Sequence, residues 1–444
     1  MTQQVCVLFK FSICIVTIIF LIPFEGLAQQ GSAEDFWPQW RGPHQNGVSL
    51  TATPPVEWSE TNNIKWKTEI PGLGAATPVV WGDRIFLLSA VPVGVSKEEE
   101  HEYRGALPER DIHRYVVVAI DRLDGEIVWE RVAGEQKPHE ATHATAGTYA
   151  SSSAITDGEH VVAFFESNGL YVYDMLGNLV WNTDLGDKRV LTEGGEGTTP
   201  ALYGNTLVLV WDHNDQSFIV AFDKRTGEEL WKTDRDELDT WATPIIVDDG
   251  RRPQVITNGW SRLRSYDLQT GEEIWYTTGL TPLTIPSPVA GDGMVYAMSG
   301  FNGAFLKAIS LVDARGDITG TGAIAWSHNR DTPYVSSPLL YDGALYFTKY
   351  VHGILSVFDA KEGKAHYGPQ RVEGLRGVMA SPVGADGRVY LTGRDGTTVV
   401  IRHGTTYEVL ATNKLDDQFS ASMALVGDQI YMRGDSYLYC ISEN

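Results

Sequence analysis

A nine-residue phrase that recurs at a fixed interval constrains this chain more than any other feature. DKRTGEELW, residues 223–231, returns as DLQTGEEIW, residues 267–275, which is an interval of 44 residues. Looser copies cover residues 121–129 and 174–181. A period of this size predicts an array of equivalent units, each burying its apolar face against its neighbours.

Each unit has the pattern of four short strands. It opens with a small hydroxyl residue, usually before Pro, and a short apolar run, and a turn such as Asp292-Gly293 leads to a second, alternating strand. A third strand ends at the Asp of the phrase and a fourth carries its Trp. Asp-Gly between apolar runs indicates a hairpin, because Gly accepts positive φ freely. Four antiparallel strands in about 40 to 50 residues are typical of one blade of a β-propeller.

Eight such units can be counted, and the eighth lacks its fourth strand. We expect the missing strand at the other end, where residues 64–69 carry Trp66 with no blade before it. The sequence therefore predicts an all-β domain over residues 64–444. It is an eight-bladed β-propeller of four-stranded antiparallel blades, with the ring closed by pairing of residues 64–69 with residues 436–442. Closure of this kind leaves no inner strand edge exposed.

The phrase A-x-D-x-x-T-G-x-x-x-W, matched closely by residues 221–231, resembles the repeat of pyrroloquinoline-quinone (PQQ)-like propellers. That superfamily holds quinoprotein alcohol dehydrogenases and the non-enzymatic propeller lipoprotein of the outer-membrane β-barrel assembly machinery. The opening WPQWRGP, residues 37–43, is similar to exported bacterial proteins of this kind. The resemblance covers about residues 36–442 and implies fold rather than activity. In such repeats the phrase serves packing, which here assigns structural roles to Asp223, Gly227, Trp231, Asp267, Gly271 and Trp275.

Segments outside the repeats indicate an exported protein. Residues 1–28 have the pattern of a signal peptide, with an apolar run after Lys10 that is short for a membrane span; an uncleaved anchor is the alternative. After cleavage we expect no stable membrane span, and a periplasmic or secreted location. Residues 29–63 are expected to form an irregular arm over the propeller surface, and residues 91–114 a charged surface insertion in the first blade.

The net charge and the cysteine content limit which binding partners and which disulfides we expect. The net charge of -22 excludes nucleic acid, because phosphate binding needs a basic face. Cys440 would be the single cysteine left after signal cleavage, so we expect no internal disulfide. An envelope protein, or a small molecule such as a sugar, remains as a partner.

The string His139-Glu140-Ala141-Thr142-His143 matches the H-E-x-x-H zinc signature. That chemistry needs a helix that points both histidines to one face. Pro138 precedes the string and Gly147 follows it closely, so we interpret it as a loop between blades. We assign no metal site to it.

Loops that enter a first strand reach the central face of a propeller, so they supply the candidate ligand residues. His143, Tyr149, Trp241 and Tyr334 come from such loops. The two arginines of the phrase GWSRLRSYD share one strand face, where they would hold an anionic ligand or form ion pairs at the rim. The ligand-binding candidates are therefore His143, Tyr149, Trp241, Tyr334, Arg262 and Arg264.

No complete catalytic set is recognisable in the sequence. It has no G-x-S-x-G motif and no adjacent cysteine pair of the kind quinoprotein alcohol dehydrogenases often carry. We therefore favour an exported, non-catalytic propeller that acts as a binding or scaffolding module. The alternative is a PQQ-dependent dehydrogenase for an alcohol or sugar, in which Ca²⁺ polarises the quinone and a base takes the hydroxyl proton.

Overall fold

The computed structural model describes residues 1–2, 32–95, 112–143, 147–190 and 194–443. The expected signal peptide therefore lies almost wholly outside the described residues. Every strand belongs to the compact unit Gly31–Asn444. The helical elements of the described chain are two single turns of 3₁₀ helix, η1 (Ala33–Asp35) and η2 (Glu166–Asn168). No described helix has the length and apolar character needed to cross a membrane.

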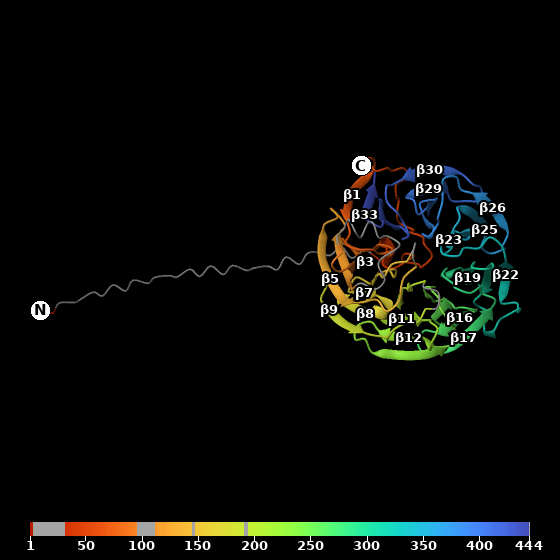
Figure 1. Cartoon of the computed structure of the whole chain (residues 1–444), viewed down its shortest axis with the longest axis horizontal. Helices are drawn as coiled ribbons and strands as arrows, with labels where there is room; N and C mark the ends of the chain where they lie inside the picture. Colours follow the sequence, from red (N-terminus) through yellow and green to blue (C-terminus); the bar gives the residue numbers. More distant parts are fainter. Residues whose placement is uncertain (3–31, 96–111, 144–146, 191–193, 444) are drawn as a thin grey trace. The chain divides into compact units, whose positions relative to one another are not determined.

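The strands form eight antiparallel sheets that follow one another around a ring (Figure 1). The first four blades, each given from its inner to its outer strand, are β2 (Val79–Trp81), β3 (Arg84–Pro92), β4 (His113–Asp121) and β5 (Ile127–Gln136); β6 (Ile155–Thr156), β7 (His160–Phe164), β8 (Leu170–Asp174) and β9 (Leu179–Thr183); β10 (Ala201–Tyr203), β11 (Thr206–Trp211), β12 (Ser217–Asp223) and β13 (Glu229–Arg235); and β14 (Ile245–Val247), β15 (Gln254–Asn258), β16 (Arg262–Asp267) and β17 (Glu273–Thr278).

The remaining blades repeat this order. They are β18 (Val289–Gly291), β19 (Met294–Ser299), β20 (Phe305–Ser310) and β22 (Ile324–His328); β23 (Leu339–Tyr341), β24 (Ala344–Thr348), β25 (Ile354–Asp359) and β26 (Ala365–Arg371); β27 (Val383–Ala385), β28 (Arg388–Thr392), β29 (Thr397–Arg402) and β30 (Val409–Lys414); and β31 (Ala424–Val426), β32 (Gln429–Arg433), β33 (Tyr437–Ser442) and β1 (Ile64–Glu69).

Strand β1 closes the ring, as the sequence predicts. It pairs antiparallel with β33, with Trp66 opposite Cys440 and Glu69 opposite Tyr437. The predicted eight-bladed, all-β propeller is therefore confirmed. The last blade therefore combines strands from both ends of the chain, held together by main-chain hydrogen bonds.

A tryptophan on the outer strand of one blade packs against the turn of the next blade. At five junctions its Nε1–H donates to the carbonyl of the residue that follows the repeat Asp, over 2.7–3.3 Å. The donor and acceptor pairs are Trp66 and Arg122, Trp129 and Met175, Trp181 and Lys224, Trp231 and Leu268, and Trp326 and Ala360. The indole lies over the turn glycine: Gly271 has φ +72°, and a Cβ there would overlap the ring of Trp231. Two residues of the repeated phrase therefore meet across a blade junction.

Trp275 departs from this rule although it is fully buried. The blade after it departs from the repeated D-x-x-T-G phrase, and the chain there forms an extra strand, β21 (Gly316–Asp317), that pairs parallel with β17. Trp275 lies opposite Gly316 in this pairing, and its Nε1–H donates 3.0 Å to the Gln254 side chain of its own blade. The extra strand takes the place of the missing turn.

A second set of contacts joins the blades around the channel. At seven junctions the backbone N–H of the hydroxyl residue before one blade donates to the side-chain hydroxyl of the equivalent residue in the next blade, over 2.8–3.0 Å. The chain of donors and acceptors runs Thr77, Ser153, Thr199, Thr243, Ser287, Ser337, Ser381, Ser422. The Thr77 hydroxyl, at the eighth junction, is buried without a hydrogen-bond partner. The recurring hydroxyl residues are thus inter-blade connectors.

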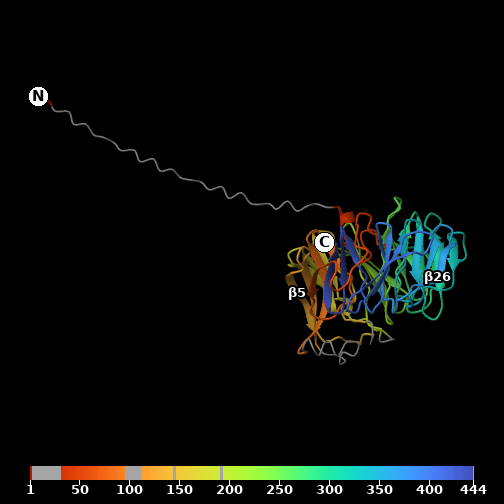
Figure 2. The ribbon, with the colours of Figure 1, turned by 90° about the horizontal axis from the view of Figure 1, so that it is seen from above.

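The arm that precedes β1 lies against one face of the ring (Figure 2) but is more than a surface arm. Trp37, Arg41 and Trp58 are buried. The Arg41 guanidinium donates to the carbonyls of Pro382 over 2.6 Å and Pro338 over 2.7 Å, which belong to two different blades. The sequence prediction of a peripheral arm is therefore incomplete, because the WPQWRGP segment fills one end of the channel.

Replacement of Trp231 by Ala should destabilise the propeller by about 3–5 kcal/mol, because it removes a large buried ring and an inter-blade hydrogen bond. Leu230→Ala is the matched control, since Leu230 lies next to it on β13 with its side chain exposed. We expect the control to change the free energy of unfolding by less than about 0.5 kcal/mol. Urea unfolding of the three proteins measures this, and equal effects of both substitutions would contradict the packing role.

One substitution at two sites tests the hydroxyl ring. Thr199→Val leaves the buried Ser153 N–H without an acceptor and should cost about 1–3 kcal/mol. Thr77→Val removes a buried hydroxyl that has no partner, so it should be neutral or stabilising. Thermal unfolding of both variants compares them, and a Thr77→Val protein as unstable as Thr199→Val would exclude this account.

Candidate functional site

The central channel opens into a cavity of about 640 Å³. All eight blades contribute residues that precede their first strand: Ala75; Ser151 and Ser153; Gly197 and Thr199; Trp241 and Thr243; Leu283 and Ile285; Tyr334 and Val335; Met379 and Ser381; Ser420 and Ser422. Trp40 of the arm also lines it, next to the buried Arg41. The complete cavity therefore forms only when the ring of blades is closed and the N-terminal arm lies against the channel.

Aromatic side chains dominate one part of the cavity wall. The Tyr334 ring lies between Phe301 and Tyr350, with centroid separations of 5.0 Å to each. Trp241 stands on the wall with its Nε1–H donating 2.7 Å to the Gly195 carbonyl. All four rings, and that of Trp40, are only partly buried, so each keeps surface open to the cavity.

Backbone strain is concentrated around the same channel. Among the described residues other than Gly, Asn and Asp, those with positive φ are Arg41, Gln45, Glu166, Leu283 and Tyr350. The last two line the cavity, the first two line a small void beneath it, and Glu166 lines a small void behind its wall. Left-handed backbone costs about 1–3 kcal/mol at such residues and persists where the surroundings enforce it. Residues with an intrinsically unfavourable backbone conformation therefore gather around the channel in the described part of the chain.

A buried ion pair stands behind the cavity wall. Lys188 Nζ lies 2.5 Å from Glu166 Oε2, and their side chains keep 3% and 5% of their surface. The other Glu166 oxygen accepts from the Thr198 N–H, the Thr198 hydroxyl and the Ser152 hydroxyl. A buried carboxylate needs such a set of donors to offset its lost hydration.

Glu196 lies between this pair and the cavity. Its carboxylate accepts from the Ser167 N–H and hydroxyl, and its side chain keeps 14% of its surface. Burial and, next, the neighbouring Glu166 carboxylate raise the pKa of Glu196 to about 7, although Lys188 and the hydrogen bonds from Ser167 act in the opposite direction. The carboxyl of Glu196 therefore changes charge near neutral pH, at the cavity wall.

The structure brings three of the predicted ligand residues together. His143, Trp241 and Tyr334 line the cavity, from three different blade entries. Tyr149 does not; its ring packs on His113, with centroids 4.9 Å apart. Its place in a ligand site was expected because of its loop, but the side chain turns toward the first blade.

Arg262 and Arg264 lie away from the cavity. Arg264 is buried and pairs with Glu237 at 2.8 Å, Glu273 at 2.5 Å and Asp236, and Arg262 pairs with Asp236 at 2.8 Å. The sequence left two interpretations of these arginines, an anionic ligand or ion pairs, and the structure shows the ion pairs. Their charges are already compensated by carboxylates.

The H-E-x-x-H string forms no helix in its described residues. His139 Nε2 contacts the Lys188 carbonyl at 2.6 Å, and the Glu140 carboxylate accepts the Val190 N–H. These partners place the string as a loop, as the sequence predicts.

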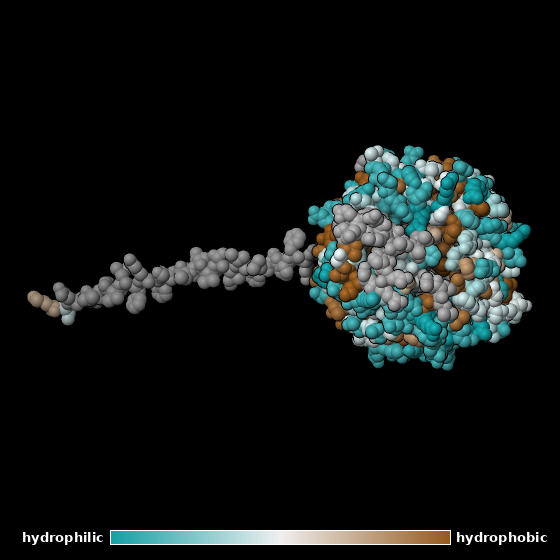
Figure 3. Space-filling model, viewed as in Figure 1, coloured by the Kyte–Doolittle hydropathy of each residue, from teal (hydrophilic) through white to brown (hydrophobic). Residues whose placement is uncertain are grey.

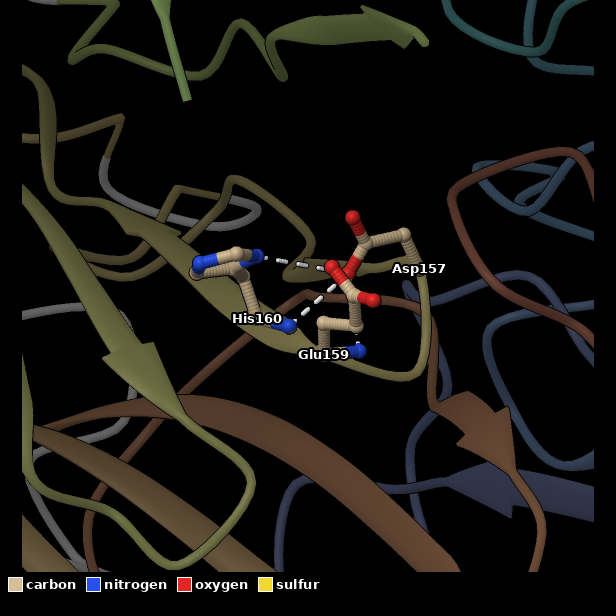
Figure 4. A group of neighbouring side chains, drawn as sticks. All are labelled: Asp157, Glu159 and His160. Carbon is tan, nitrogen blue, oxygen red and sulfur yellow. Dashed lines mark hydrogen bonds and ion pairs between the residues drawn. The ribbon is translucent and has the colours of Figure 1, made fainter. Parts of the chain in front are cut away.

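One group of described residues has the spacing of a metal site, but it is a hairpin turn. Asp157, Glu159 and His160 sit at the turn between β6 and β7 (Figure 4). Asp157 already pairs with Lys224 and accepts the backbone N–H groups of Glu159 and His160. The group lies outside the cavity and has no feature that points to an ion.

Sequence reasoning did not find Glu196, Glu166, Trp40, Phe301 or Tyr350. Glu196 lies in the segment GGEGTTP, which has no pattern beyond a loop before a first strand. Trp40 belongs to the arm, and only the folded ring places it in the channel. The available signal was position: every one of the cavity residues Ser153, Trp241 and Tyr334 precedes a first strand, and Glu196 does so as well.

The fold and its repeats define a PQQ-like β-propeller. The chain belongs to the family described as outer membrane protein assembly factor BamB, whose model matches residues 54–215 and 215–444. No curated protein matches the chain by sequence.

Solved structures share the fold at low sequence identity. BamB from Moraxella catarrhalis is 13% identical, with a TM-score of 0.55, over 85% of this chain and 97% of that one. A europium-containing methanol dehydrogenase is 11% identical, with a TM-score of 0.60, over 93% and 98%. The quinohemoprotein alcohol dehydrogenase of Comamonas testosteroni is 13% identical, with a TM-score of 0.60, over 93% and 81%. Identities this low establish the fold alone.

Glu196→Gln should remove a pH-dependent loss of stability. Because the pKa in the folded state is raised, the folded protein keeps a proton that the unfolded chain releases, so stability falls as pH rises from about 4.5 to about 7. A rise from 4.5 to about 7 corresponds to about 3 kcal/mol.

Urea unfolding of both proteins from pH 4 to 8 measures this difference. Glu166, Lys188, His139 and Tyr115 surround Glu196 and are present in both proteins, so the difference isolates Glu196. Glu130→Gln on the exposed face of β5 serves as the control. Parallel pH profiles for all three proteins would contradict the raised pKa.

Proposed function

We propose that this protein is an exported, non-catalytic β-propeller that binds a small molecule in its central cavity. The cavity carries this proposal: eight blades and the arm converge on it, five aromatic rings line it, and its volume of about 640 Å³ suits a small organic ligand. Export rests on the signal-peptide pattern of residues 1–28 and accords with the description of the family as an outer-membrane assembly factor.

The described wall does not suit PQQ. This cofactor is a tricarboxylate, and no Lys or Arg occurs among the described lining residues, while Glu196 adds a like charge. Its Ca²⁺ needs several oxygen ligands, and the described wall gathers no second carboxylate beside Glu196. These residues favour the binding module over the dehydrogenase.

A scaffolding role would use the outer surface instead. The described surface in view is mostly polar (Figure 3), but β5 and β9, whose outer edges are unpaired, expose Ile127, Val128, Val132, Leu179 and Val180. Residues 91–92 and 113–114 of the expected insertion belong to strands β3 and β4, and residues 96–111 lie outside the described part of the chain. The exposed apolar side chains on the unpaired edges of β5 and β9 are the observation that supports a protein partner.

Trp241→Ala should weaken small-ligand binding about tenfold, because it removes a ring that the ligand would stack on. A fluorescence-monitored thermal-shift screen of uncharged, cationic and anionic small molecules supplies the ligand, and calorimetry compares the variants. Trp241→Phe keeps a ring and should retain most of the affinity. Deletion of residues 97–110 should leave it unchanged. The opposite pattern would move the functional site to the insertion and favour scaffolding.

Addition of PQQ and Ca²⁺ to the purified protein tests the alternative. We expect no quinone absorbance after desalting and no alcohol-dependent dye reduction. A retained quinone together with dye reduction would establish the dehydrogenase.

A further inference from the structure

The charge of the cavity wall has one sign. Among the described lining residues, Glu196 is the only Asp, Glu, Lys or Arg. The ion pair behind it, Glu166 with Lys188, is neutral as a pair, so it does not offset a Glu196 carboxylate. A ligand in this cavity meets the negative charge of Glu196 and no described Lys or Arg side chain.

Trp241 lies next to the backbone that carries Glu196. Its Nε1–H is bonded to the Gly195 carbonyl, and a Cβ on Gly197 would lie 3.8 Å from its Cδ1, so the indole spans the backbone on both sides of Glu196. The face of an indole carries negative potential, and a cation is attracted to it. Carboxylate and indole therefore favour the same kind of guest.

A sugar would instead need many free hydrogen-bonding groups, and the cavity wall offers few of them. The described wall offers mainly hydroxyls, and five of these already accept a backbone N–H of the preceding blade: Ser153, Thr199, Thr243, Ser381 and Ser422. The Phe301, Tyr334 and Tyr350 rings add mainly apolar area, with one hydroxyl on each tyrosine. A guest with an apolar body and a positive centre uses both parts of the wall.

We propose that the cavity binds an organic cation of the alkylammonium class, with the charged nitrogen at Trp241 and Glu196 and the apolar body along Phe301, Tyr334 and Tyr350. This inference rests on the proposed binding function and names its ligand class. Protonation of Glu196 removes the negative charge, so cation binding should strengthen as pH rises from 6 to 8. Glu166, Lys188, His139 and Tyr115 also face Glu196 and remain constant in the comparison below.

Two pairs of probes that differ in charge alone test the proposal: choline with 3,3-dimethylbutan-1-ol, and benzyltrimethylammonium with neopentylbenzene. Titration calorimetry and tryptophan fluorescence measure their affinities for the full-length protein. We expect each cation to bind at least about tenfold more tightly than its neutral partner. Glu196→Gln should remove most of this preference and its pH dependence, while the affinity for the neutral probes stays the same.

Two results would overturn the proposal in different ways. Equal affinity for the cation and its neutral partner, or an anionic hit from the thermal-shift screen, would exclude the cationic ligand class and leave the binding function standing. Absence of any binder in the screen, with the protein folded by its melting transition, would remove the binding function and this inference with it. Glu130→Gln, which alters a carboxylate outside the cavity, should behave as the wild type in every titration.

Discussion

The contact between an outer-strand indole and the turn of the next blade is the interaction on which this structure depends. A single four-stranded sheet of this size cannot bury both faces, so each blade is stable only against its neighbours. The indole meets two needs at once, because it covers the turn glycine and satisfies the carbonyl after the repeat Asp. Where the turn is missing, next to Trp275, the chain adds β21 to cover the ring.

The hydroxyl residues before the first strands, from Thr77 to Ser422, join neighbouring blades in the same way near the axis, where the blades lie too close together for large side chains. Each hydroxyl satisfies a backbone N–H that would be buried without a partner, and it belongs to a different blade. The inner ends of the blades are thereby held in fixed positions, which gives the cavity a constant shape. A rigid, pre-formed cavity binds with little loss of conformational entropy.

The wall of that cavity is where the chain departs from local preference. Leu283 and Tyr350 adopt positive φ, and Glu196 is a carboxyl whose proton is lost near neutral pH. Both features cost stability and persist because the ring around them is strongly determined. Their location at one cavity, shared with five aromatic rings, is the physical reason for assigning a binding role to it.

Local patterns in the amino-acid sequence were sufficient to predict the fold. The 44-residue period, the Asp-Gly turns and the unmatched strand at residues 64–69 specified eight blades and their closure, because each is a local signal repeated many times. It also placed His143, Trp241 and Tyr334 on the central face, because they precede first strands. Only the tertiary structure placed Glu196 beside Glu166 and Lys188, turned Tyr149 away, paired Arg262 and Arg264 with carboxylates, and seated the arm in the channel. These depend on contacts between residues of different blades, and a pattern within one repeat carries no information about them.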